Sequence, residues 1–331
     1  MSLIKKAVVA AGLLMLGYLL WRLDPRRTAE LALTVGWLFV PIFLQEVGAH
    51  GLNALGWRLA FRPENAASFS FWDLFRYRVM GDGVNYLTPS ATIAGEFARA
   101  SLLSDAEPLP VRVNGVVAAK FSQGIAQVAF ICVGLGWCVR DSVPSLAGYA
   151  EAARATAWGL AAASAVFYLL ARSRRAGRPS KTVPEGWKGW VSRLPSDLSS
   201  LAADHPLRCL GSIAAFTAGY AWNTGESWLI AHALGIRIDW TTALHIEVLS
   251  NMIDAVLFMV PAKAGTQEAG KTLIFSLLGL PPRAGLAFGL VRHARELTWA
   301  GLGLGAYAAH ERSRKAAGAA LPSAAPAPLA P

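Results

Sequence analysis

The stretch GDGVNYLTPSATIAGEFAR, residues 81–99, decides the fold of this chain because it interrupts an apolar sequence with charges, glycines and a proline. A second stretch, MIDAVLFMVPAKAGTQEAGK, begins at Met252 and matches the first when the sequence is shifted by 172 residues without gaps. The shift aligns Met80 with Met252, Asp82 with Asp254, Val84 with Val256, Pro89 with Pro261, Glu96 with Glu268, and Arg99 with the similar Lys271. The chain therefore contains the same polar interruption twice.

The composition places both interruptions in a membrane protein. The sequence is 54% hydrophobic and 16% charged, with a mean hydropathy of +0.39, which is more apolar than an ordinary soluble domain. Apolar runs of about 20 residues, long enough to cross ~30 Å of hydrocarbon, recur along the chain. The predicted spans lie near 4–21, 31–50, 113–139, 155–171, 208–232 and 285–309. The first resembles a signal peptide but ends without a small-residue cleavage site, so we expect an uncleaved anchor.

The net charge of +10 is concentrated beside the predicted spans. Seven Lys and Arg residues stand against three acidic residues between Arg172 and Pro206, and Arg312, Arg314 and Lys315 follow the last span. Such clusters are typical of cytoplasmic loops and favour anionic lipid headgroups. We therefore expect a multi-pass protein of the inner membrane with a cytoplasmic C-terminus, membrane lipids as partners, and no nucleic-acid partner.

The chain divides into two halves of the same design. A second pair of matching segments, ALGWRL at 54–59 and ALGIRI at 233–238, precedes the interruption of each half. Three spans separate one repeat from the next, so the halves face opposite ways. The sequence predicts an all-α polytopic integral membrane protein with about six transmembrane helices and two re-entrant or broken helical hairpins in two inverted repeats. The predicted parts are an N-terminal anchor (1–30), membrane repeat 1 (31–171), a basic cytoplasmic loop (172–206), membrane repeat 2 (207–311) and a disordered tail (312–331).

Two prolines predict where the hairpins turn, because proline lacks the N–H donor and disfavours helix at the preceding residue. A carboxylate follows each proline by seven residues and a basic residue follows three later, which places an acid and a base on one helix face. This pair either locks the hairpin as an internal ion pair or contacts a polar headgroup, and the two roles are compatible. The predicted hairpin residues are Asp82, Pro89, Gly95, Asp254, Pro261 and Gly265.

Polar side chains also share one face of each span that follows a broken segment. Lys120 and Gln123 lie on one such face, Arg292 and Arg295 lie on the other, and the 172-residue shift relates Lys120 to Arg292. At the bilayer centre each charge costs ~2.5–3.5 kcal/mol on insertion scales, so these groups either pair with one another or line a hydrated cavity. We predict a headgroup cavity lined by Asn85, Glu96, Arg99, Lys120, Gln123, Glu268, Lys271, Arg292, Arg295 and Glu296. Further polar groups in predicted spans are Glu46, His50, Asn223 and Glu226.

Motifs of common enzymes are missing from the sequence. It contains no H-E-x-x-H, G-x-S-x-G or P-loop pattern, so zinc protease, serine hydrolase and P-loop NTPase activities lack support. The three cysteines have no metal-ligand spacing. We expect no cofactor, no metal and no catalytic residue. The GLGLG motif at 301–305 has the spacing of a helix-packing groove.

Two blocks carry a resemblance to a known family. NYLTPSATIAGEFARASLL and VPAKAGTQEAG resemble the Asn…Pro…Gly-Glu…Arg block and the later Pro…Gly…Glu block of flippase-like membrane proteins. That family is related to the transmembrane region of lysylphosphatidylglycerol synthases and includes hopanoid-biosynthesis-associated membrane proteins. The resemblance covers roughly residues 30–310, with Ala94 where a second glycine is common. The chain ends soon after the last span, without a soluble aminoacyl-transferase domain, so the resemblance implies lipid translocation and not lipid aminoacylation.

Three functions remain open on the sequence alone. The first is a flippase or transporter that moves a polar-headed lipid, such as a hopanoid or an isoprenoid-linked lipid, across the inner membrane. The second is an intramembrane lipid-modifying enzyme with Glu96 or Glu268 as general base. The third is a non-catalytic partner of lipid-biosynthesis enzymes.

Overall fold

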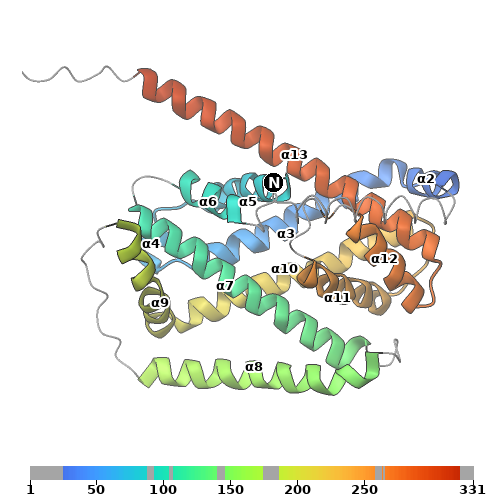
Figure 1. Cartoon of the computed structure of the whole chain (residues 1–331), viewed down its shortest axis with the longest axis horizontal. Helices are drawn as coiled ribbons and strands as arrows, with labels where there is room; N and C mark the ends of the chain where they lie inside the picture. Colours follow the sequence, from blue (N-terminus) through green and yellow to red (C-terminus); the bar gives the residue numbers. More distant parts are fainter. Residues whose placement is uncertain are drawn as a thin grey trace, which may run out of the picture.

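The computed structural model describes residues 25–87, 93–103, 107–139, 146–173, 186–257, 263 and 265–320, and regular structure in these ranges is helical (Figure 1). The elements are α2 (Pro25–Leu33), the 3-10 turn η1 (Gly36–Leu38), α3 (Phe39–Leu59), α4 (Pro63–Ala66), α5 (Phe71–Leu87), α6 (Ile93–Leu102), α7 (Leu109–Val133), the π-helical turn η2 (Gly134–Val139), α8 (Ala147–Ser173), α9 (Gly186–Asp204), α10 (Pro206–Ala233), α11 (Trp240–Val256), α12 (Thr266–Leu277) and α13 (Pro282–Ala320). The predicted span at 4–21, the prolines Pro89 and Pro261, and residues 321–331 lie outside the described ranges.

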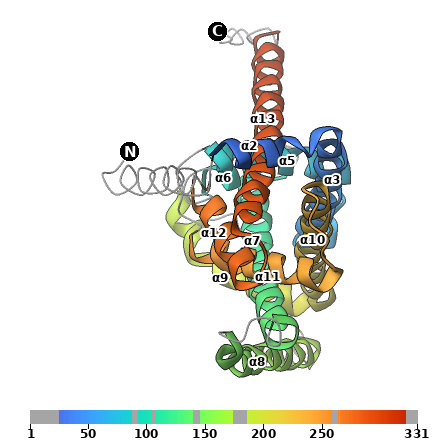
Figure 2. The ribbon, with the colours of Figure 1, turned by 90° about the vertical axis from the view of Figure 1, so that its right-hand side faces the viewer.

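Helices α3 and α10 form the antiparallel centre of the bundle. The indole Nε1 of Trp222 donates to the carbonyl of Gln45 at 2.8 Å, and Ser212 Oγ donates to the carbonyl of Gly56 at 2.8 Å. A Cβ on Gly56 would lie 2.8 Å from the Phe216 ring, so the missing side chain allows this close approach. Helix α8 lies at one edge of the bundle, and the C-terminal part of α13 projects beyond the other helices on the opposite side (Figure 2).

Both polar interruptions break the helix where the sequence predicts. Helix α5 ends at Leu87 and α6 begins at Ile93, while α11 ends at Val256 and α12 begins at Thr266. With 10 and 12 residues, α6 and α12 are about 15 and 18 Å long, too short to cross ~30 Å of hydrocarbon. The helix lengths therefore favour re-entrant hairpins over pairs of full spans. The α5–α6 pair lies toward the α4 end of the bundle, and the α11–α12 pair lies toward the other end (Figure 1).

Two of the predicted hairpin glycines have a clear local reason. Gly265 is the N-cap of α12 with φ 75°, in the left-handed region that glycine adopts without steric cost. Gly95 lies against α5, where the side-chain Oδ1 of Asn85 accepts a hydrogen bond from the Gly95 N–H at 2.7 Å. A Cβ on Gly95 would lie 2.2 Å from the backbone oxygen of Gly81. Asn85 thus caps the start of α6 and holds the first hairpin closed.

We expect Gly95→Ala to destabilise the first hairpin by about 1–3 kcal/mol, because the new methyl group would lie 2.2 Å from the Gly81 carbonyl oxygen and 2.3 Å from the Asn85 side chain. Melting of the purified variant in detergent measures this loss. The matched control is Gly301→Ala in α13, where a Cβ meets nothing within 4 Å and stability should be unchanged or slightly higher. Equal melting temperatures for the two variants would contradict the packing described.

Helix–helix contacts of the first half have equivalent contacts in the second half. Helix α3 packs on α5 as α10 packs on α11, α6 packs on α7 as α12 packs on α13, and α5 packs on α13 as α11 packs on α7. The α5–α13 contact is close because a Cβ on Gly303 would lie 2.3 Å from the Val79 oxygen. Gly303 is therefore a packing residue of the GLGLG motif, while Cβ atoms on Gly301 and Gly305 would meet nothing within 4 Å.

The structure also moves some predicted boundaries. The span predicted at 31–50 is divided, because α2 ends at Leu33 and Gly36 adopts φ 46° before α3 runs from Phe39 to Leu59. Helix α13 continues to Ala320, and α9 lies inside the predicted basic loop. Within the described ranges, the segment Leu109–Cys138 is the one helix long and apolar enough to cross a membrane by length and composition. The number of about six spans stays a prediction.

Candidate functional site

Charged side chains form a layer inside the bundle, between two apolar clusters. The first cluster includes Trp57, Phe61, Leu74 and Phe216. The second includes Ile42, Phe130, Ile230 and Phe288. Glu46 and His50 lie between the two clusters on α3, and Glu226 lies between them on α10. Two ion-pair networks make up this layer, and they are neighbours because Glu46 of one lies one helical turn from His50 of the other.

The first network joins the two arms of the first hairpin. Arg78 Nε donates to Asp82 Oδ2 at 2.9 Å, and Arg99 of α6 reaches the other oxygen of Asp82. Arg99 Nη1 also donates to Glu96 at 2.7 Å, so one buried guanidinium bridges both carboxylates. His50 Nδ1 lies 3.6 Å from Asp82 Oδ2. The acid–base pair predicted from the spacing of Glu96 and Arg99 is confirmed.

Lys120 of α7 completes the first network from outside the hairpin. Its Nζ lies 3.4 Å from Glu96 Oε1, and its side chain is 46% exposed, against 18% for Glu96. The sequence showed no acid for Lys120 within its own span, and the structure supplies one from α6. Gln123, one turn further along α7, lines the small space between Lys120, Glu96 and the two arginines of the hairpin.

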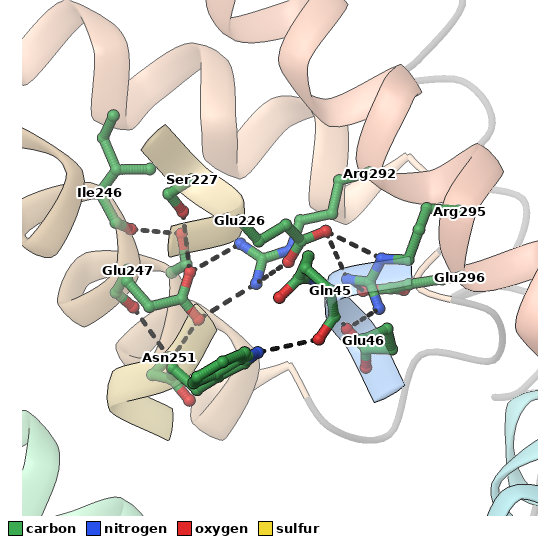
Figure 3. A network of polar contacts seen from close by, with 12 residues as sticks. Gln45, Glu46, Glu226, Ser227, Ile246, Glu247, Asn251, Arg292, Arg295 and Glu296 are labelled. Carbon is green, nitrogen blue, oxygen red and sulfur yellow. Dashed lines mark hydrogen bonds and ion pairs between the residues drawn. The ribbon is translucent and has the colours of Figure 1, made fainter. Parts of the chain in front are cut away.

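The second network is centred on two arginines of α13 (Figure 3). Arg292 donates through Nη1 and Nη2 to both oxygens of Glu247 at 2.9 and 3.1 Å, and its Nη2 lies 3.1 Å from Glu226. Arg295 donates through Nε to Glu226 at 2.8 Å and pairs with Glu46 at 2.7 Å. All of these groups except Glu46 are fully buried or nearly so. The two guanidiniums therefore tie α13 to α3, α10 and α11.

The second hairpin joins this network through Lys263. Its Nζ donates to Asp254 at 2.9 Å and to Glu296 at 3.4 Å. Glu268 does not repeat the pairing of Glu96, because its Oε1 lies 2.5 Å from His293 Nδ1. No ion pair joins Glu268 to Lys271 among the described residues. The predicted acid–base pair therefore forms in the first hairpin only.

Described residues of both hairpins contact the same part of α13. The ring of Tyr86, near the end of α5, lies 6.2 Å from the ring of His293 in an edge-on arrangement. Lys263 contacts Glu296, which lies one helical turn from His293 on α13. Tyr86 of the first hairpin and Lys263 of the second therefore meet neighbouring turns of α13.

The two networks carry opposite net charges in the part of the chain that the structure describes. In the first, the cations Arg78, Arg99 and Lys120 outnumber the carboxylates Asp82 and Glu96 by one. In the second, the carboxylates Glu46, Glu226, Glu247, Asp254 and Glu296 outnumber the cations Lys263, Arg292 and Arg295 by two. With neutral histidines, the first network is therefore positive and the second negative.

The predicted headgroup cavity is closed at the first network. The space between Arg78, Glu96, Arg99 and Lys120 holds about 10 Å³, which is close to the minimum for one water molecule. Open space begins beside it, where α7 and α8 border a groove of about 540 Å³. The groove is lined by Glu96, Val116, Val117, Lys120, Phe121, Gly124, Ile125, Val128 and Leu160. Charges that pair with one another thus stand at the edge of a largely apolar groove.

Sequence reasoning missed four members of the networks: Arg78, Glu247, Lys263 and His293. Arg78 had a readable signal, since it precedes Asp82 by one helical turn. The other three take partners from other helices, which no local spacing reveals. Among the described residues, no set of three His, Cys, Asp or Glu side chains has the geometry of a metal site.

Comparisons with known proteins identify one family. A family profile described as the lysylphosphatidylglycerol synthase TM region matches residues 3–305, which is most of the chain. The resemblance inferred from the two polar blocks is thereby confirmed. A comparison with curated proteins and one with solved structures each gave no match.

Proposed function

The chain belongs to the lysylphosphatidylglycerol synthase TM-region family of membrane domains, and from this membership we propose that it moves a polar-headed lipid across the membrane. The observation that carries the proposal is the layer of buried charges in the middle of the bundle. Groups of this kind are costly in hydrocarbon and are typical of the paths that polar substrates follow. The substrate would be a hopanoid or an isoprenoid-linked lipid whose polar headgroup meets these charges.

The proposal includes two inverted repeats. The support is that equivalent helices pack in the same pairs in both halves, and that the two hairpins lie toward opposite ends of the bundle (Figure 1). Broken helices at matching positions of inverted repeats are a common design of transporter sites near the midplane. Each half would then open the shared charge layer to one side of the membrane in turn. Movement of the hairpins relative to α7 and α13 would expose the now closed site.

We propose that the basic loop and the C-terminus face the cytoplasm of an inner membrane, because both carry an excess of Lys and Arg. Single cysteines introduced by Ser180→Cys and Ser323→Cys should react with a membrane-impermeant maleimide only after the cells are permeabilised. A cysteine introduced at Arg237, after the fifth predicted span, should react in intact cells and serves as the control. Labelling of either serine position in intact cells would reverse the topology.

Reconstitution into liposomes tests the proposed function directly. Full-length protein is incorporated with fluorescent and native lipids from the source membrane, and the lipids that reach the opposite leaflet are measured and then analysed chemically. Intact lipid that moves at a rate proportional to the amount of protein supports translocation. Chemical conversion of the lipid would instead indicate an intramembrane enzyme. Neither movement nor conversion would favour a non-catalytic partner of lipid-biosynthesis enzymes.

A further inference from the structure

The groove between α7 and α8 has the shape and polarity of a lipid site. Phe121, Ile125 and Val128 lie along one face of α7, and all three side chains are more than 40% exposed. Leu160 of α8 borders the opposite side. The volume of about 540 Å³ is within the range of about 300–1,000 Å³ that is typical of ligand pockets. One polar end, formed by Glu96 and Lys120, is all that interrupts the apolar lining.

The position of this polar end matters for the depth of a bound headgroup. Lys120 lies near the middle of the segment Leu109–Cys138, which is long and apolar enough to cross a membrane. From Lys120 to Val128 the groove follows α7 for about 12 Å, which is most of the thickness of one leaflet of a ~30 Å core. A lipid with its chain in the groove would therefore hold its headgroup near the middle of the membrane. A phospholipid reaches that depth only while it crosses.

The charge at this end selects the headgroup. Arg78 and Arg99 are buried and bind Asp82 and Glu96 closely, whereas Lys120 is half-exposed and lies 3.4 Å from a carboxylate that already binds Arg99. Three cations therefore share two carboxylates, and the surplus positive charge faces the groove. An ammonium group is a compact donor that suits a phosphate oxygen. A cationic headgroup would be repelled at the same place.

We propose that this groove binds a lipid with an anionic phosphate headgroup, with the phosphate at Lys120 Nζ and an acyl chain along Phe121, Ile125 and Val128. The inference rests on the proposed function, for which it names the class of lipid. Binding can nevertheless be measured without transport. Two variants separate the two parts of the site: Lys120→Gln removes the charge, and Gly124→Leu fills the groove. Gly124 is suited to this because a Cβ there meets nothing within 4 Å.

The test is native mass spectrometry of the full chain in detergent, titrated with phosphatidylglycerol, phosphatidylethanolamine and a cationic lipid of the same chain length. We expect phosphatidylglycerol to bind at least ~10-fold more tightly than the cationic lipid, and Lys120→Gln to remove about that factor. Gly124→Leu should weaken binding of all three lipids. The controls are Arg76→Gln, an exposed residue paired with Asp73, and Gly301→Leu, which faces open space; both should bind as the wild type does.

Three results would overturn the inference. They are unchanged phosphatidylglycerol binding in Lys120→Gln, tightest binding of the cationic lipid, and displacement of the lipid by millimolar inorganic phosphate, which would indicate a site for free phosphate. The outcome is separate from that of the proposed function. A wild-type protein that binds phosphatidylglycerol in the groove but moves no lipid in liposomes refutes translocation and leaves this site in place. A protein that moves lipid while both variants bind normally refutes the site alone.

Discussion

Arg292→Gln is expected to remove most of the folded protein from the membrane, the largest loss of stability that we predict for a single side chain. Arg292 is 6% exposed and contacts both oxygens of Glu247 and one oxygen of Glu226. Its network already holds two more carboxylates than cations, so losing this guanidinium increases the repulsion among buried anions. Breaking a buried ion pair by removing one partner costs about 3–5 kcal/mol, a large part of the ~5–15 kcal/mol that stabilises a typical protein.

Yield of monodisperse protein in detergent and its melting temperature measure this effect. Arg76→Gln is the matched control, because the Arg76 side chain is 64% exposed and its ion pair with Asp73 lies on the helix surface, an arrangement worth about 0–1 kcal/mol. Arg292→Lys keeps the charge but not the two-pronged contact with Glu247, so its stability should fall between the wild type and Arg292→Gln. Normal yield and melting of Arg292→Gln would show that the α13 network does not hold the bundle together.

Glu96→Gln should reduce lipid translocation about tenfold or more while the protein stays folded. We expect the variant to fold because Arg99 keeps its contact with Asp82, and because Lys120 is half-exposed to solvent or lipid headgroups that can compensate its charge. A contact between charged groups is worth about 1.5–3 kcal/mol, which corresponds to at least a tenfold change in rate if it is needed during transport. Because the repeat places Glu268 at the matching position, Glu268→Gln should behave in the same way.

The liposome assay and a melting curve on the same samples distinguish a transport role from a structural one. If Glu96 and Glu268 only hold the hairpins, the variants should melt at lower temperature and transport normally per folded molecule. Glu107→Gln provides the control carboxylate, because Glu107 accepts hydrogen bonds from Asn65 and Ser68 outside the charge layer. A folded Glu96→Gln, Glu268→Gln double variant that moves lipid at the wild-type rate would refute the proposed path through the charge layer.

The sequence was sufficient to predict the features that depend on local chemistry. Proline and glycine punctuation predicted both helix breaks, and the three-residue spacing of Glu96 and Arg99 predicted their ion pair. The 172-residue register also identified Glu96, Glu268, Lys120 and Arg292 as members of one charge layer. These predictions succeeded for one reason. Helix breaks and contacts between neighbouring turns of one helix depend only on residues that are close in the sequence.

Partners from distant helices could not be predicted in this way. Glu268 contacts His293 where the repeat suggested Lys271, and Asp254 contacts Lys263, for which the first half has no counterpart in the alignment. The same residue type in the same register thus takes different partners, because each carboxylate is neutralised by whichever base the packing of α13 or α7 brings near. The groove beside Lys120 was equally hidden, since it exists only where α8 returns along α7.

The tight packing of the charge layer has a consequence for the membrane as an electrical barrier. The space of about 10 Å³ among Arg78, Glu96, Arg99 and Lys120 has room for about one water molecule, too little for a file of water between these four side chains. A headgroup that travels along the outer groove, with its chains still in the lipid, needs no such file. On the proposed function, a polar group would then pass the middle of the bilayer while the ion gradients across that bilayer are not short-circuited.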